Sequence, residues 1–245
     1  MELSAISQAN EKTLWNSLAQ KAGITLDATQ IGRLNSYLDL LFAANERMNL
    51  TRIATRADAE ILHIGDALTL LPHLPPQAHR LADIGAGGGV PGMVLAIARP
   101  DIRVTLIEAT RKKADFLRDA VKTLQLSNVA VIADRAEKIA RTPARESFDI
   151  VVARAVALLP ILVEWLLPLA KTGGIVLAMK GPRAIEELKQ ASAPTRLLGG
   201  GEAQAIPADL PQTTGHLIVK IPKIRPTPAR FPRDPSIAKG SPISR

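Results

Sequence analysis

Residues 81–92 constrain the fold more than any other stretch of the chain. They read Leu-Ala-Asp-Ile-Gly-Ala-Gly-Gly-Gly-Val-Pro-Gly, an apolar run that contains Asp83 and leads into a glycine-rich loop. The apolar run is typical of a buried strand, glycine allows the sharp turn that follows, and Pro91 fits the first position of a helix. Because the N–H groups at the start of a helix lack partners, this segment predicts a cradle for a nucleotide-type cofactor.

Two cofactor classes fit this loop. Residues 87–92 match G-x-G-x-x-G, the fingerprint of dinucleotide-binding proteins, which is a weak signal when it stands alone. Asp83 lies inside the end of the predicted strand, two residues before Gly85, and this position favours the second class. The pattern D-I-G-x-G-x-G resembles motif I of class I S-adenosylmethionine (SAM) methyltransferases. That resemblance implies that Asp83 serves the ammonium group of the SAM methionine.

The composition limits the class of protein and its chemistry. With 245 residues, 47% of them hydrophobic, the chain is long enough to bury one sizeable core. No apolar run reaches the ~18 residues that span a bilayer, and the first residues do not resemble a secretory signal, so we expect a cytoplasmic protein without a membrane partner. The absence of cysteine excludes disulfides, thiolate–metal sites and a cysteine nucleophile. The histidines lack metal-ligand spacing, so we expect no metal.

The formal net charge of +8 is placed unevenly along the chain. Residues 220–245 carry seven lysines and arginines but a single acid, Asp234. Clustered cations beside an otherwise balanced domain indicate a polyanion partner, although a merely soluble tail has the same composition.

The order of predicted elements indicates the fold class. Helices are predicted at 9–22, 27–45 and 56–70, with Asp27 and Gln30 as a capping box, and a proline-rich break follows at 71–76. From residue 80 onward, strands alternate with helices, which predicts a mostly parallel, seven-stranded Rossmann-like sheet with helices on both faces. We therefore divide the chain into an N-terminal helical extension (1–76), a SAM-methyltransferase domain (77–222) and a basic, proline-rich, extended tail (223–245). The predicted strands are 80–85, 103–108, 129–133, 148–153, 174–179 and 216–221, with a short one near 203–206, and the later helices are 91–99, 111–124, 135–140, 159–170 and 183–191.

Ligands of such sheets lie across the carboxyl ends of the strands. Glu108, at the end of the second strand, can accept both ribose hydroxyls of an adenosine. Ala136 and Glu137 follow the third strand and face the predicted adenine position, although Glu137 fits a solvated first helical turn equally well. Arg154 ends the fourth strand beside the methyl-donor end of the cofactor, and Lys180 is a weaker candidate at the end of the fifth.

Several motifs together resemble one family, the RsmG (GidB) family of bacterial 16S rRNA guanine-N7 methyltransferases. The resemblance covers roughly residues 35–243. The motifs are Met-Asn-Leu-Thr-Arg-Ile at 48–53, His63 with Asp66, the glycine loop at 83–92, Arg-Lys-Lys-Ala-Asp-Phe-Leu at 111–117, Ala136-Glu137, Phe148-Asp149 with Arg154-Ala155, Met179-Lys180-Gly181 and Phe231-Pro232-Arg233.

The resemblance implies site residues and a reaction. Arg154 and Asn49 are assigned catalytic roles, and His63 borders the pocket. The implied substrate is a guanosine in the 530 loop of 16S rRNA, in free RNA, a small subunit or an assembly intermediate, methylated by a monomer that releases S-adenosylhomocysteine. Since guanine N7 has a free lone pair, in-line transfer needs no general base. The predicted cofactor contacts are Asp83, Gly85, Gly87, Val90, Glu108, Ala136, Glu137 and Arg154, and the predicted RNA contacts are Lys180, Lys220, Arg230, Arg233 and Lys239.

Two other functions stay open on sequence alone. An NAD(P)-dependent reductase needs a tyrosine–lysine or similar pair at the hydride site, and Tyr37, the only tyrosine, precedes the main domain. A non-enzymatic RNA-binding module could also keep this fold, although the combination of the glycine loop, Glu108 and Arg154 favours an enzyme.

Overall fold

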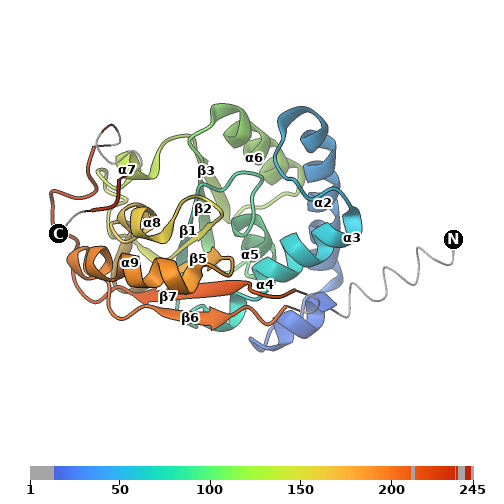
Figure 1. The fold of residues 1–245 in the computed structure, drawn as a ribbon. Helices are drawn as coiled ribbons and strands as arrows, with labels where there is room; N and C mark the ends of the chain where they lie inside the picture. The colour runs from blue at the N-terminus through green and yellow to red at the C-terminus, as the bar shows by residue number, and fades with distance from the viewer. Residues whose placement is uncertain (1–13, 211–212, 235, 237–240, 244–245) are drawn as a thin grey trace, which may run out of the picture.

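The computed structural model describes residues 14–210, 213–234, 236 and 241–243. Within these residues, seven strands form one sheet in the order β3-β2-β1-β4-β5-β7-β6 (Figure 1). The strands β1 to β5 run parallel to one another, whereas β7 is antiparallel to both β5 and β6. The strands are β1 (Arg80–Ile84), β2 (Arg103–Ile107), β3 (Val129–Ile132), β4 (Phe148–Arg154), β5 (Ala170–Lys180), β6 (Gln204–Pro207) and β7 (Leu217–Pro222).

Helices cover both faces of the sheet, as the alternation of elements predicts. Strand residues alternate between the faces: Leu81 and Val152 pack with α2, α4, α5 and α6, whereas Ala82 and Val151 pack with α7, α8 and α9. The α/β, Rossmann-like fold class is therefore confirmed. The helices are α2 (Ala28–Met48), α3 (Arg56–Ala59), α4 (Asp66–Leu68), α5 (Gly92–Ala98), α6 (Arg111–Thr123), α7 (Ala136–Ile139), α8 (Leu159–Leu166) and α9 (Ala184–Leu197).

The chain order of the parallel strands reverses between β1 and β4. Strand β1 pairs with β2 on one side and with β4 on the other, so the connections leave β1 and β4 toward opposite faces. A crevice forms at such a point outside the carboxyl ends of the strands, and it is where open α/β sheets bind ligands. The topology thus places the ligand site at the glycine loop.

Several predicted helices differ from the structure. Helix α8 ends at Leu166, short of the predicted residue 170 where β5 already begins, and α9 continues to Leu197, past the predicted residue 191. Helix α5 begins at Gly92, and Pro91 is its N-cap rather than its first residue. The stretch predicted as one helix at 56–70 is instead α3, a π-helix at Glu60–Gly65 and then α4. Of the helix predicted at 9–22, residues 14–20 are helical and residues 9–13 lie outside the described part.

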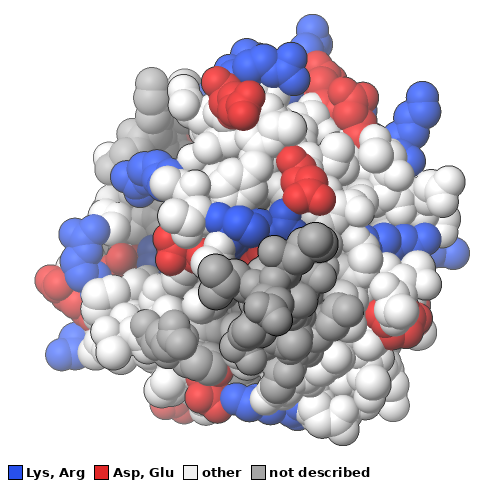
Figure 2. Space-filling model, turned by 90° about the vertical axis from the view of Figure 1, so that its right-hand side faces the viewer, with Lys and Arg blue, Asp and Glu red and all other residues white. Residues whose placement is uncertain are grey.

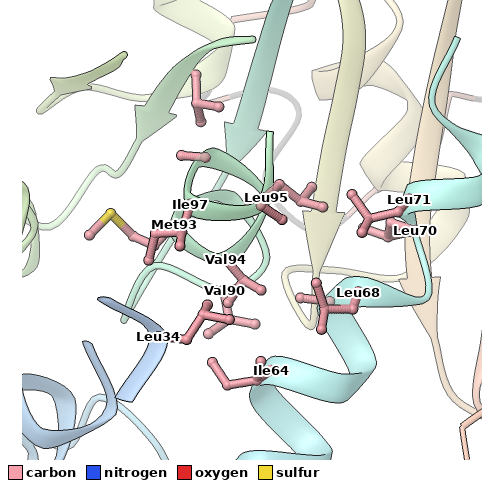
Figure 3. Packing of buried hydrophobic residues seen from close by; sticks show 14 of the residues in the cluster. Leu34, Ile64, Leu68, Leu70, Leu71, Val90, Met93, Val94, Leu95 and Ile97 are labelled. Atoms are coloured by element: carbon pink, nitrogen blue, oxygen red, sulfur yellow. The ribbon is translucent and has the colours of Figure 1, made fainter. Parts of the chain in front are cut away.

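The N-terminal helices share the core of the sheet domain. Figure 3 shows Leu34 of α2 and Ile64 of the π-helix gathered around Val90 and Val94, which belong to the glycine loop and α5. The predicted capping box at the start of α2 is confirmed, and the Nε2 of Gln30 also donates to the carbonyls of Ile97 and Ala98, 2.9 and 3.2 Å away at the end of α5. The proline-rich break that ends at residue 76 therefore interrupts the sequence pattern, but the hydrophobic core is continuous between the N-terminal helices and the sheet domain.

The segment 223–234 is irregular, as its prolines predict, but it is not a free extended tail. The side chain of Lys223 is buried, and its ammonium donates to the Leu167 and Leu198 carbonyls, at the C-terminal ends of α8 and α9. Arg145 donates to the Phe231 carbonyl at 2.7 Å. Because these contacts satisfy helix ends and a half-buried guanidinium, the segment packs as part of the domain.

Candidate active site

A cavity of about 380 Å³ lies at the carboxyl ends of β1 and β4. Five of the predicted cofactor residues, Gly85, Gly87, Val90, Glu108 and Arg154, meet in its wall. Its size is within the range of small-molecule sites. The other lining residues are Leu41, Leu50, Thr51, His63, Ala86, Gly88, Ala109, Lys113, Ala155 and Val156.

The glycine loop needs glycine at Gly85 for two reasons. Its φ of +67° lies in the left-handed region, which side chains disfavour. A Cβ there would also lie 2.8 Å from the Val156 side chain, in the loop that follows β4. The loop is held to the sheet because the Gly85 and Ala86 N–H groups both donate to the Ile107 carbonyl, at 2.8 and 3.2 Å.

Glu108 holds the same loop from the end of β2. One carboxylate oxygen accepts the Gly87 N–H at 2.9 Å, and the other accepts the Thr110 N–H at 2.7 Å. Each carboxylate oxygen has a second lone pair, so both remain able to accept a hydroxyl donor from the cavity. The geometry fits the predicted role of Glu108 toward a ribose.

Asp83 is buried behind the glycine loop and does not line the cavity. Its Oδ2 accepts the Gly92 N–H at 2.8 Å, and a Cβ on Gly92 would come within 2.7 Å of that oxygen. Its Oδ1 has no hydrogen-bond partner among the described residues. Burial raises the pKa of Asp83 to about 7, against the opposing effect of the Gly92 hydrogen bond. A nearby cationic donor would supply the missing partner and favour the charged carboxylate.

Arg154 is fixed by groups on the π-helix and on α4. Its Nη1 donates to the Leu62 carbonyl at 2.7 Å and lies 3.3 Å from Asp66 Oδ2, and its Nη2 lies 2.8 Å from His63 Nδ1. A guanidinium can only donate, so Nδ1 of His63 carries the lone pair and Nε2 carries the proton. That Nε2–H lies 3.0 Å from Thr51 Oγ1. Burial and the neighbouring Arg154 lower the pKa of His63 to about 3, which keeps the imidazole neutral.

The π-helix is a feature that sequence reasoning missed. Its residues, Glu-Ile-Leu-His-Ile-Gly, look like an uninterrupted helical pattern. π-Turns are rare and often mark functional sites, and here the wide turn presents the Leu62 carbonyl and His63 to Arg154. Asp66, which follows the π-helix, bridges Arg154 and His216, with 3.2 Å between its Oδ1 and the His216 Nδ1. The His63–Asp66 spacing was the available signal.

Tyr37 was also missed as a site residue. It is completely buried on α2, and its hydroxyl donates to the Gly88 carbonyl of the glycine loop at 2.7 Å. Burial raises the pKa of Tyr37, so the hydroxyl stays protonated as a donor. Leu41, one turn further along α2, lines the cavity. Helix α2 is therefore part of the site wall.

Besides Asp83, three predicted cofactor or catalytic residues do not line this cavity. Asn49 is exposed and caps the end of α2 in the left-handed conformation, at φ +51°, which asparagine tolerates. Its neighbours Leu50 and Thr51 reach the cavity instead. Ala136 and Glu137 begin α7 and are buried outside the lining.

The predicted RNA contacts have different surroundings. Lys180 forms an ion pair with Glu187 at 2.7 Å and donates to the Ala157 carbonyl, and Arg233 forms a bidentate pair with the fully buried Glu164. Lys220 is half-buried on β7, and Arg230 is exposed over the Phe231 ring. Lys239 lies outside the described residues. Two of the five cations therefore already have internal partners.

The face of the molecule in Figure 2 shows lysines and arginines interspersed with acids rather than gathered in one patch. In the part of the chain that the structure describes, no group of three or more histidines and acids could hold a metal ion. The helices of the described part include none that is long and apolar enough to cross a membrane.

Comparison with known proteins decides the family. The family model GidB, described as rRNA small subunit methyltransferase G, matches residues 30–209. The chain belongs to the GidB family. Curated GidB relatives named "Ribosomal RNA small subunit methyltransferase G" include one from Sorangium cellulosum, 50% identical over 69% of this chain and 72% of the relative. Another, from Limosilactobacillus reuteri, is 41% identical over 90% of this chain and 94% of the relative.

Solved structures show the same fold for this GidB chain. The cofactor-bound Rv0187 protein from MTB has a TM-score of 0.53 and 22% identity, and the alignment covers 78% of this chain and 91% of that one. The SAM complex of the O-methyltransferase TomG from Streptomyces achromogenes has a TM-score of 0.52 and 20% identity, over 84% of this chain and 95% of that one. These two structures show the fold alone. As a member of the GidB family the chain is a SAM-dependent methyltransferase, and the free acceptors on Asp83 and Glu108 suit such a cofactor.

Proposed function

We propose that this protein methylates N7 of a guanosine in the 530 loop of 16S rRNA, by direct in-line transfer without a general base. Membership of the GidB family and the names of its relatives support rRNA of the small subunit as the substrate. The observation that carries the choice of N7 is the state of His63. This imidazole lines the pocket, but its basic nitrogen already accepts from Arg154.

The residues proposed to hold SAM come from four elements of the site. Glu108 takes the ribose hydroxyls, the glycine loop supplies a close approach to bare backbone at Gly85 and Gly87, and Val90 forms one wall. Asp83 offers its free Oδ1 to the ammonium group. Ala136 and Glu137 are proposed for the adenine end. When bound, SAM would supply a methyl group on a positively charged sulfur: a free lone pair can attack the methyl carbon, and the electrons of the C–S bond leave with S-adenosylhomocysteine.

The lack of a suitable general base in the cavity lining favours some acceptor atoms over others. An exocyclic amine or a hydroxyl must lose a proton during methylation, whereas guanine N7 has a lone pair at neutral pH. His63, with a pKa lowered to about 3 and its Nδ1 occupied, is poorly suited to remove a proton. The other titratable groups in the lining are Glu108, which accepts two backbone N–H groups, and the cations Lys113 and Arg154. The pocket is therefore suited to holding a base that is already nucleophilic.

Arg154 is proposed as the residue that orients the reacting groups. Three contacts fix its guanidinium at the cavity wall, so its position is set before any ligand enters. Such preorganisation reduces the cost of bringing the base and the methyl donor into line. Asn49, exposed beside the rim residues Leu50 and Thr51, is proposed to contact the RNA.

Nucleoside analysis of small-subunit rRNA from cells with and without the gene tests the proposal. We expect the gene deletion to remove one 7-methylguanosine from the 530 loop, and the wild-type gene to restore it. A gene carrying Arg154→Ala should not restore it. Unchanged 7-methylguanosine in the deletion strain would contradict the proposed function.

The reductase alternative has little support in the site. Tyr37, the tyrosine such an enzyme would need, is buried and donates to the Gly88 carbonyl. A binding comparison between SAM and NADH separates the two functions, and we expect binding of SAM alone.

A further inference from the structure

Five exposed or half-exposed cations lie on two chain segments, 47–52 and 111–113, that also supply residues to the cavity wall. We call them the pocket-side basic face, and they come from the end of α2, the loop after it and the first turn of α6. The Nζ of Lys112 lies 3.5 Å from the Arg47 carbonyl, which brings the two helices together, and Lys113 itself lines the cavity. The members are Arg47, Arg52, Arg111, Lys112 and Lys113.

These cations are not neutralised by the protein. Across the described residues, none of the five forms an ion pair, whereas Arg118 on the same α6 pairs with Asp115, and Lys138 pairs with Asp134. Local pairing therefore occurs on α6 itself, at Arg118, and the basic face does not use it.

The position of three of these cations disfavours the helix that carries them. Arg111, Lys112 and Lys113 fill the first turn of α6, which contains no acid, and the side chain of Thr110 does not cap it. The N-terminal end of a helix carries partial positive charge, so cations there are repelled and acids are preferred. Folding alone gives no reason for this arrangement, but an anion bound across the face would compensate for it.

We propose that the pocket-side basic face binds backbone phosphates of the RNA substrate on either side of the target nucleotide, and that the C-terminal segment does not. This inference rests on the proposed function. The face borders the cavity into which the target base must be splayed, so phosphates flanking that base pass over it. The large exposed hydrophobic residues of the described chain, Leu158, Ile185 and Ile224, lie outside α2 and α6, which argues against an apolar partner here.

Two matched triple variants of the full-length protein test the proposal. The first removes three cations of the face that do not line the cavity, as Arg47→Gln/Arg111→Gln/Lys112→Gln. The control removes three exposed cations elsewhere, as Lys122→Gln/Lys189→Gln/Arg230→Gln. Binding to purified 16S rRNA is measured across monovalent salt, together with the Kd for SAM, methyl transfer and thermal stability.

We expect the first triple variant to reduce the slope of log Kd against log salt by about 2, because each phosphate contact contributes roughly 0.7–0.9. Its KM for RNA should rise at least about tenfold, with kcat and the Kd for SAM unchanged, whereas the control should behave as wild type. Its thermal stability should be equal or higher, since the repulsion at the start of α6 is relieved.

Three results would overturn the proposal. They are an equal loss of slope in both triple variants, an unchanged slope in the first, and a weaker Kd for SAM in the first. Loss of binding to phosphatidylglycerol vesicles with intact RNA binding would assign the face to a membrane instead. The two proposals can also be separated. If the first triple variant has a smaller salt slope than wild type but the wild-type protein forms no 7-methylguanosine, the proposed function fails while the RNA-binding face stands.

Discussion

The C-terminal segment (223–234) and the pocket-side basic face both carry several lysines and arginines, but their cations have different partners. In the C-terminal segment, Lys223 is buried against helix ends and Arg233 is paired with Glu164. On the basic face, the five cations have no ion-pair partner within the described residues. The C-terminal segment therefore uses two of its four cations to hold the domain together.

This difference shows that a run of charged residues in a sequence does not reveal which of them are paired in the folded protein. Glu164 lies 69 residues before Arg233 in the chain, so the sequence around Arg233 does not indicate its partner. The cations of the basic face are spread over two segments and gather only when α2 packs beside α6. The polyanion surface is thus a property of the folded protein.

The largest effect is expected for Arg154→Ala, which concerns the pocket side of the comparison. The variant removes the guanidinium held by Leu62, His63 and Asp66, and methyl transfer should fall on the order of 10²–10³-fold. Because Arg154 points inward to these groups, the salt dependence of RNA binding should stay unchanged. Arg154→Lys, which keeps the charge but not the planar fork, should recover little activity. Normal turnover by either variant would show that the donor end lies elsewhere.

The next largest effect is expected for Arg233→Ala on the C-terminal side. It leaves the fully buried Glu164 carboxylate without its bidentate partner, so the free energy of unfolding should fall by about 3 kcal/mol in denaturant titrations. RNA affinity of the folded variant should match that of wild type. Arg230→Ala, at an exposed neighbouring cation, should change stability by less than about 0.5 kcal/mol. A stable Arg233→Ala protein with a reduced salt slope would reverse the comparison.

The pH dependence of stability should report His63. Its pKa is lowered to about 3 in the folded protein, so the unfolded chain takes up the proton first as the pH falls. The contribution of His63 is therefore complete above about pH 6.5 and is lost toward pH 3, by at most about 1.4 kcal/mol per pH unit. Between pH 6.5 and 5, His63→Asn should lose about 2 kcal/mol less stability than wild type.

The quantity to measure in that titration is the difference in the free energy of unfolding between wild type and His63→Asn. Burial raises the pKa of Asp83 to about 7, so its contribution is present below about pH 4 and is lost as the pH rises to 7. This opposes the His63 effect in the same range and cancels when wild type and His63→Asn are compared. Parallel stability curves would contradict a buried, neutral His63 in solution.

The smallest effect is expected for Tyr37→Phe, which tests whether α2 supports the cofactor loop. Loss of the hydrogen bond to Gly88 should weaken SAM binding about fivefold, or about 1 kcal/mol, while the KM for RNA stays constant. Gln30→Ala is the matched control, because it removes the α2 contacts to the far end of α5. It should lower stability without changing the Kd for SAM. Equal effects of both variants on SAM binding would reduce Tyr37 to a packing residue.

The sheet and the glycine loop could be predicted because their signals are local. Each strand is a short apolar run, and the positions of Gly85, Glu108 and Arg154 at strand ends follow from the parallel topology. Strand β5 differs most, since it begins at Ala170 where the sequence favoured the continuation of a helix. The Rossmann-like architecture thus required little beyond periodicity and turn residues.

The rest of the site depends on contacts between distant segments. Arg154 is recognisable as a lone cation after a buried strand, but its partners on the π-helix lie about 90 residues earlier. Tyr37 lies 51 residues before the carbonyl it holds. Asn49 belongs to a recognisable motif, but only the structure shows that it is exposed and that Leu50 and Thr51 reach the cavity instead. Side-chain roles of this kind follow from packing and not from spacing.

The most direct test of this account follows one methyl group from the cofactor pocket to the RNA. Purified protein is incubated with methyl-labelled SAM and small subunits from a strain lacking the gene, and the 16S rRNA is digested to nucleosides for mass spectrometry. The account predicts that the label appears in 7-methylguanosine from the 530 loop. Label in another nucleoside, or no transfer by protein that binds SAM, would contradict it.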